Sequence, residues 1–210
     1  MRSAWKKYSV VPLGVLMLGL AGCDSVLQAM GLRTEEPIAE TSEDDASEQI
    51  GTQALTVSET GSVLRNEEAD IEITLPATWS EDDRLHDSAE LEASDIDQQL
   101  YLVVVAEEND SLLRLGLREN AENYRKLLID RLQAFQGESP TDLAFVGDHF
   151  ASQYEIRGDI NENTAVVYLH TTVVTERRYY QIVAWTTPEQ YDVYKSELET
   201  ITETFREIGS

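Results

Sequence analysis

The sequence predicts an α+β domain in which an antiparallel β-sheet is flanked by helices. Two observations support this prediction. Short segments rich in Val, Ile, Tyr and Thr follow one another between residues 143 and 186, separated by short polar turns, as in an antiparallel meander. The stretch 118–136 and the chain after Thr187 carry apolar residues at spacings of three and four, which is the helical period.

The first strand of the domain is predicted around residues 71–75. Ile71, Ile73 and Leu75 alternate with polar residues, which indicates a strand with one buried face, and Pro76 ends it. The more continuous apolar run 100–106 is typical of a central strand with both faces covered.

An amphipathic helix is predicted over residues 118–136, ending at Gly137. One stripe along it is apolar and consists of Leu117, Ala121, Tyr124, Leu128, Leu132 and Phe135. We therefore expect this whole stripe to face the core.

The C-terminal half is predicted to contain a meander and a closing helix. Strands are expected at residues 143–146, 150–157, 165–174 and 179–186. Thr187 then supplies an N-cap, Pro188 the first helical residue and Gln190 a capping-box side chain. The closing helix carries one apolar stripe, formed by Tyr191, Tyr194, Leu198, Ile201, Phe205 and Ile208.

The last hairpin suggests a binding surface. If Glu176 and Arg177 form a two-residue turn, one face of the hairpin is dry and is assigned to the core under the closing helix. Those dry residues are Val167, Leu169, Val173, Tyr180, Ile182 and Ala184. The opposite face is predicted to be a partly open partner-binding surface, because it mixes aromatic and polar side chains: Tyr168, His170, Tyr179, Gln181 and Trp185. The alternative is a second core face covered by the other helix.

The order of these elements resembles the PsbP-like superfamily. The resemblance covers about residues 61–208 and rests on a strand closed by Leu-Pro-x-x-Trp, and on the run from Tyr180 to Glu189 with Tyr191, Tyr194 and Phe205 after it. It implies a PsbP-like α/β/α sandwich and non-enzymatic work. Members include an extrinsic photosystem subunit, a Ran-binding transport factor, chaperones of secreted toxins, and the DcrB-like envelope lipoproteins that this chain resembles most in character.

The first residues are organised like a secretory signal peptide. Arg2, Lys6 and Lys7 precede the apolar run 10–20. That run ends in Leu20-Ala21-Gly22-Cys23, which resembles the lipobox cut by the lipoprotein signal peptidase. Residues 1–22 are therefore expected to be removed.

Cys23 is expected to become the lipid-modified N-terminus, carrying a diacylglycerol and acyl chains such as palmitate. It is the single cysteine of the chain, so an intramolecular disulfide is excluded. Asp24 resembles the signal that retains such lipoproteins in the inner membrane of Gram-negative bacteria, with the outer membrane as the alternative. The expected location is the periplasmic side of the cell membrane.

Residues 23–60 are predicted to be the lipidated cysteine and an acidic, flexible tether. Nine acidic residues and one basic residue occur in 24–60, without a sustained helical or strand period. The globular domain is expected at 61–210, a size of about 150 residues that suits one core.

The charge of the chain restricts its partners. Cleavage after residue 22 removes three basic residues and no acid, so the formal charge moves from −24 to −27. Such a charge repels nucleic acid and anionic lipid headgroups. The expected partners are the membrane, through the lipid anchor, and an unidentified envelope protein.

The sequence contains none of the motifs that mark common catalytic or phosphate-binding sites. His86, His149 and His170 lie far apart, without a second metal ligand at the usual spacing, so no metal site and no cofactor are predicted. The sequence therefore favours a membrane-anchored, non-enzymatic binding or assembly module of the cell envelope. An enzyme with an unrecognised site and a purely structural envelope component are the alternatives.

Overall fold

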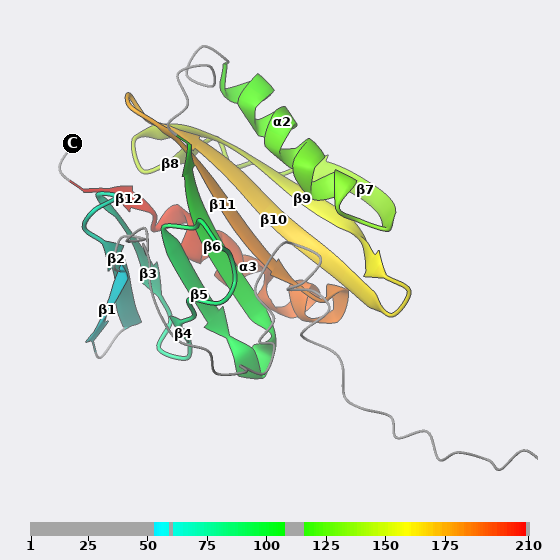
Figure 1. Ribbon diagram of the computed structural model, residues 1–210, viewed down its shortest axis with the longest axis horizontal. Coiled ribbons are helices and arrows are strands. Elements are labelled where there is room, and N and C mark those ends of the chain that lie inside the picture. Colours follow the sequence, from blue (N-terminus) through cyan, green and yellow to red (C-terminus); the bar gives the residue numbers. More distant parts are fainter. Residues whose placement is uncertain (1–52, 59–60, 108–115, 209–210) are drawn as a thin grey trace, which may run out of the picture.

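The structure, a computed structural model, describes residues 53–58, 61–107 and 116–208. Two antiparallel sheets and two α-helices make up this part of the chain (Figure 1). The smaller sheet has the order β1 (Gln53–Ser58), β2 (Gly61–Asn66), β3 (Ile71–Leu75) and β12 (Arg206–Glu207). The larger sheet has the order β4 (Ser80–Glu81), β5 (Leu91–Asp95), β6 (Leu100–Glu107), β11 (Tyr179–Thr186), β10 (Thr164–Val174), β9 (His149–Asn161) and β7 (Ala134–Pro140), and β8 (Phe145–Val146) pairs with β9. The helical elements are η1 (Ile96–Gln98), α2 (Leu117–Asp130) and α3 (Pro188–Glu203).

One face of the large sheet packs against α3 and the small sheet. Leu198 and Ile201 of α3 lie in the same core cluster as Leu64 and Ile73 of the small sheet and Leu169 of the large one. The dry hairpin face predicted from the sequence, Val167, Leu169, Val173, Tyr180, Ile182 and Ala184, belongs to this cluster. Its assignment to the core beneath the closing helix is confirmed.

The start of α3 follows from its local sequence. Thr187 is the N-cap, and its side chain accepts a hydrogen bond from the Gln190 backbone N at 3.3 Å. Pro188 occupies the first turn, where its missing N–H leaves no partner unsatisfied. The segment between β3 and β4 is joined to α3 through Trp79, whose indole Nε1 donates to Glu197 Oε1 at 3.0 Å.

The opposite face of the large sheet is covered by α2 (Figure 1). Leu128 of α2 lies in a second core cluster with Ile156, Tyr168 and Trp185. The molecule is therefore an antiparallel sheet with a helix on each face, which confirms the predicted α+β sandwich.

The helix prediction 118–136 was wrong at its C-terminal end. α2 ends at Asp130, and Ala134–Pro140 forms strand β7, which pairs with β9. Phe135, expected in the core, is 48% exposed. Leu132 and Phe135 continue the helical spacing, but residues 134–140 pair with β9 instead, so tertiary structure overrides the local pattern.

The predicted boundary of the tether was also wrong. Gln53–Ser58, assigned to the tether 23–60, forms β1 and pairs in register with β2, so ordered structure begins before residue 61. Strands β1, β2 and β3 form a sheet of their own together with β12, rather than an extension of the large sheet. Residues 1–52, with Cys23 and Asp24, lie outside the described part.

Candidate functional site

The predicted hairpin register is confirmed, but the predicted open surface was wrong. Thr172 faces Gln181, and Tyr168 faces Trp185, as a two-residue turn requires. The backbone N of Thr175 donates to the carbonyl O of Arg178 at 2.9 Å and closes that turn. Every side chain proposed for partner binding is at most 4% exposed: Tyr168, His170, Tyr179, Gln181 and Trp185.

This face can be buried because several of its polar side chains form hydrogen bonds with one another and with residues of α2 and β6. Gln181 Nε2 donates to Asn120 Oδ1 of α2 at 2.7 Å and to Glu107 Oε2 of β6 at 2.8 Å. Gln181 Oε1 accepts from Thr172 Oγ1 at 2.7 Å. The mixture of aromatic and polar residues suggested an open surface, but these residues belong to an internal polar network. They cannot contact a partner in this conformation.

His170 completes the network as a neutral side chain. Its ring stacks on Tyr124 of α2 with 5.2 Å between ring centroids, and its Nε2 lies 2.8 Å from Gln181 Oε1. Because that oxygen is an acceptor, Nε2 carries the proton. Burial and, to a smaller extent, the charge of Arg125 lower the pKa of His170 to about 4, although its hydrogen bond to Gln181 acts in the opposite direction.

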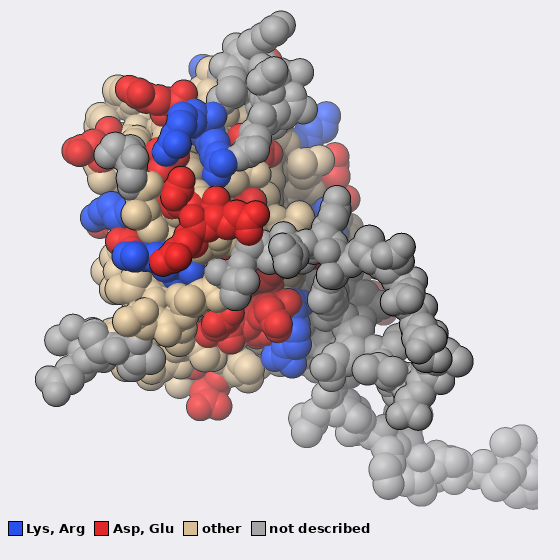
Figure 2. Space-filling model, turned by 60° about the vertical axis from the view of Figure 1, so that its left-hand side comes forward, with Lys and Arg blue, Asp and Glu red and all other residues tan. Residues whose placement is uncertain are grey.

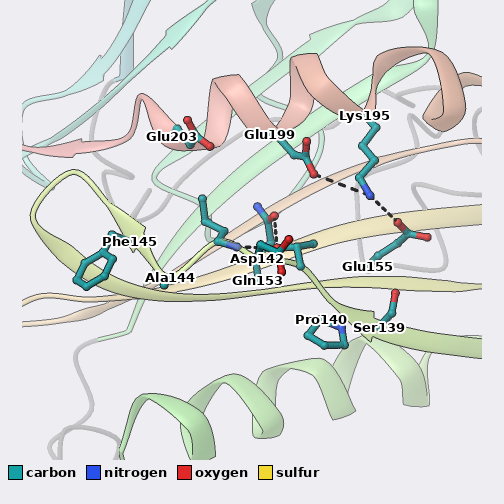
Figure 3. A pocket seen from close by; sticks show the side chains of 12 residues that line it. Ser139, Pro140, Asp142, Ala144, Phe145, Gln153, Glu155, Lys195, Glu199 and Glu203 are labelled. Carbon is teal, nitrogen blue, oxygen red and sulfur yellow. Dashed lines mark hydrogen bonds and ion pairs between the residues drawn. The ribbon is translucent and has the colours of Figure 1, made fainter.

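The accessible concave surface lies at the edge of the large sheet instead. A pocket of about 730 Å³ separates α3 from the segment 139–145, which leads from β7 into β8 (Figure 3). α3 contributes Lys195, Glu199 and Glu203, and β9 contributes Gln153 and Glu155. In the view of Figure 3, Phe145 lies at the Glu203 end, and Lys195 meets Glu155 at the other.

The inner wall of this acidic pocket is held by a chain of side-chain hydrogen bonds. Thr141 Oγ1 donates to Gln153 Oε1 at 2.8 Å, and Gln153 Nε2 donates to the buried Thr171 Oγ1 at 2.9 Å. The Thr141 backbone N also donates to the Gln153 carbonyl O at 3.0 Å. Gln153 lies on β9 and Thr171 lies on β10. The segment 139–145, which forms the outer wall of the pocket, is therefore fixed to the large sheet.

The charges of the acidic pocket are only partly neutralised. Lys195 Nζ lies 3.4 Å from Glu155 Oε2 and 3.9 Å from Glu199 Oε1. Burial raises the pKa of Glu155, but the hydrogen bond and charge of Arg157, with the charge of Lys195, lower it below its usual value. Asp142 and Glu203 also line the pocket, and neither has an ion-pair partner among the described residues. The pocket therefore keeps a negative field at neutral pH.

A second pocket of about 670 Å³ lies beyond β8. It is lined by the turn between β8 and β9, the tip of the β10–β11 hairpin and β12, including Asp148, Phe150 and Glu176. Arg177 Nη2 in this hairpin-tip pocket lies 3.6 Å from Glu207 Oε1. Neither pocket was predicted from the sequence, because each joins segments far apart in the chain; the aromatic residues on both sides of Gly147–Asp148 were the one local signal.

The three histidines occupy separate environments. His170 is buried under α2, His149 lines the hairpin-tip pocket, and His86 lies in the loop before β5 with a pKa lowered by burial. Over the described ranges, no three His, Cys, Asp or Glu side chains are grouped as metal ligands. No helix in the described part is both long and apolar enough to cross a membrane.

Solved structures match this architecture, whereas no protein-family model and no curated protein sequence matches the chain. The solution structure of cyanobacterial PsbP (CyanoP) from Synechocystis sp. PCC 6803 aligns with a TM-score of 0.50 at 15% identity, over 78% of this chain and 97% of that one. This chain has the PsbP-like fold. The fold that the resemblance implied is thereby confirmed.

Two further solved structures align with the chain at lower TM-scores. LpqN, involved in cell envelope biogenesis of Mycobacterium tuberculosis, aligns with a TM-score of 0.47 at 16% identity over 73% of this chain and 89% of that one. The Ran-binding protein Mog1p of Saccharomyces cerevisiae aligns with a TM-score of 0.44 at 10% identity, over 75% and 96%. At such low identities a structural match speaks to the fold alone, so function must be inferred from the site. The finer resemblance to DcrB-like lipoproteins stays a prediction.

Proposed function

We propose that this chain is a membrane-anchored envelope lipoprotein that acts as a non-enzymatic binding or assembly module. The observation that carries the binding role is the acidic pocket between α3 and the segment 139–145. Lys195 is paired there with Glu155 and Glu199, and Glu155 keeps a low pKa. Carboxylates that stay ionised and ion-paired suit the recognition of a charged partner better than the transfer of protons.

The membrane anchor is proposed from the N-terminal sequence. The lipobox Leu20-Ala21-Gly22-Cys23 supports lipidation of Cys23, and Asp24 supports retention in the inner membrane, on its periplasmic side. Two or more acyl chains hold a protein stably on a bilayer. The acidic residues that follow would extend the chain away from the surface and keep the folded domain accessible to other envelope proteins.

Two measurements on the native chain test this proposal. In cells supplied with a fatty-acid probe, the wild-type chain should be labelled, and Cys23→Ala should remain an unlabelled precursor, because no other thiol can receive the lipid. Persistent label on the variant would refute the anchor. Crosslinking in intact envelopes should then capture a defined protein partner through the domain; a domain that crosslinks to nothing in wild-type envelopes would refute the binding role.

A further inference from the structure

An aromatic pair projects into solvent between the two pockets. Phe145 of β8 and Phe150 of β9 face each other across the hairpin, with ring centroids 4.9 Å apart. They are 53% and 62% exposed. The residues beside them, Val146 and Ala151, point into the core with α3, so the hairpin is anchored on one side and presents two phenylalanines on the other.

This pair differs from ordinary exposed apolar residues. Single exposed hydrophobic side chains are normal on a protein surface. Phe135 and Leu127 are examples here, and Phe135 forms no ring–ring contact with another described aromatic side chain. Phe145 and Phe150 instead form a joint surface, and Phe145 lines the acidic pocket while Phe150 lines the hairpin-tip pocket. The pair therefore forms the ridge between two depressions.

Carboxylates without an ion-pair partner among the described residues line both pockets, together with Lys195 in the acidic pocket and Arg177 in the hairpin-tip pocket. Asp142 and Glu203 lie in the acidic pocket, and Asp148 and Glu176 in the hairpin-tip pocket. All four are exposed, and none forms a side-chain ion pair within the described residues. Acidic side chains also gather in contiguous groups on the face shown in Figure 2, so acidity alone would not mark a site. What distinguishes this place is that negative charge flanks an exposed aromatic pair.

We propose that the Phe145–Phe150 ridge and its two pockets bind a basic segment of a partner protein. Arg or Lys side chains of that segment would meet the carboxylates and lie over the phenylalanine rings, and its apolar side chains would cover the ridge. A protein segment fits better than a small cation, because it fills both depressions at once. This inference rests on the proposed function and names the chemistry of its partner.

Binding of defined peptides to the full chain, purified from membranes in detergent, tests the site. The probe is a short fluorescent peptide in which Arg and Lys alternate with Leu, and the control peptide carries Glu in place of Arg and Lys. The basic peptide should bind, and binding should weaken with added salt, because exposed charges are screened. Equal binding of the acidic peptide would overturn the proposal.

Variants locate the binding. Phe145→Ser combined with Phe150→Ser should weaken the dissociation constant at least about tenfold, whereas Phe135→Ser, an equally drastic change at another exposed phenylalanine, should leave it unchanged. Unaltered thermal midpoints would show that both proteins fold. An equal loss in both, or in neither, would contradict the site.

The charged half of the proposal has its own control. Asp142→Asn with Glu203→Gln should weaken peptide binding and flatten its salt dependence. The control is Glu122→Gln with Glu162→Gln, which removes the same charge from exposed positions on α2 and in the β9–β10 turn and should change neither property. Spermine serves as a probe for a small cation. If spermine competes equally well in the wild type and in the phenylalanine variants, the assignment of the site to a protein segment is overturned. If envelope crosslinks map to another face of the domain, the site is wrong while the binding role stands.

Discussion

His170 and Gln181 lie on neighbouring strands, and the imidazole Nε2 is 2.8 Å from the amide Oε1 of Gln181 in a completely buried position. The orientation of the amide is fixed, because Gln181 Nε2 already donates to Asn120 and Glu107. Among the described residues no donor reaches Nδ1 of His170. The ring is therefore neutral and carries its proton on Nε2, and it takes part in the hydrogen-bond network that joins α2 to the sheet.

Acidification should weaken the fold through this histidine. Its pKa falls from 6.5 in the unfolded chain to about 4 in the folded one, so the stability it contributes is present above pH 6.5 and is lost as pH falls towards 4. The loss between pH 7 and pH 5 is about 2 kcal/mol. His170→Gln should remove this part of the pH dependence, and His149→Gln should keep it. Urea unfolding at pH 7 and at pH 5 measures the free energy of unfolding at each pH. An equal loss of this free energy in the wild type and in His170→Gln would contradict the assignment.

Local patterns sufficed for elements whose determinants lie close together in the chain. Thr187 and Pro188 set the start of α3, since a cap involves neighbouring residues. The hairpin register followed from strict alternation along β10 and β11 and from a two-residue turn after Thr175. In both cases the predicted contacts span few residues, so tertiary structure had little to override.

Non-local pairing accounts for what the sequence did not reveal. β7 continues the helical spacing of α2, and only its pairing with β9 makes it a strand. The polar face under α2 was taken for a surface because Asn120 and Glu107, which satisfy Gln181, are distant in sequence. The acidic pocket depends on α3 lying opposite the segment 139–145, which no local pattern encodes.

The closing helix should tolerate no charge on its buried face. Leu198 is fully buried between the two sheets, so Leu198→Asp should destabilise the domain by at least about 3 kcal/mol, through a lost apolar side chain and a desolvated carboxylate. Glu199→Ala, one position further round α3, removes only a partly exposed carboxylate in the acidic pocket and should change stability little. Chemical unfolding compares them, and similar midpoints would mean that the buried face is assigned wrongly.

Close packing between β7 and β9 should make one glycine irreplaceable. A Cβ at Gly158 would lie 2.6 Å from the Ala134 carbonyl O and 2.6 Å from a methyl group of Leu132. Because the first of these is backbone, Gly158→Ala should destabilise the domain by about 1 to 3 kcal/mol. Ser152→Ala, on the same strand, leaves its Cβ in place and is the control. Thermal midpoints that fall equally in both variants would exclude steric crowding as the cause.

The loop between β4 and β5 is held by a carboxylate that resists ionisation. Glu92 Oε2 accepts hydrogen bonds from the backbone N of Leu85 at 2.7 Å and of His86 at 3.0 Å. Burial nonetheless raises the pKa of Glu92 to about 7, with the charges of Asp82 and Asp83 adding to the effect against those two hydrogen bonds. Near neutral pH this group is therefore poised between its protonated and ionised forms.

Glu92→Gln should stabilise the protein selectively at alkaline pH. The folded-state pKa of Glu92 is raised from 4.5, so the stability contributed by its proton is complete below pH 4.5 and is lost as pH rises through 7. Glutamine keeps an oxygen acceptor for the Leu85 and His86 amides without a charge to desolvate, so the variant should exceed the wild type in unfolding free energy at pH 8 and differ less at pH 5. Glu122→Gln, exposed on α2, should show no such pH-dependent gain; an equal gain at both pH values for Glu92→Gln would attribute the effect to packing rather than to ionisation.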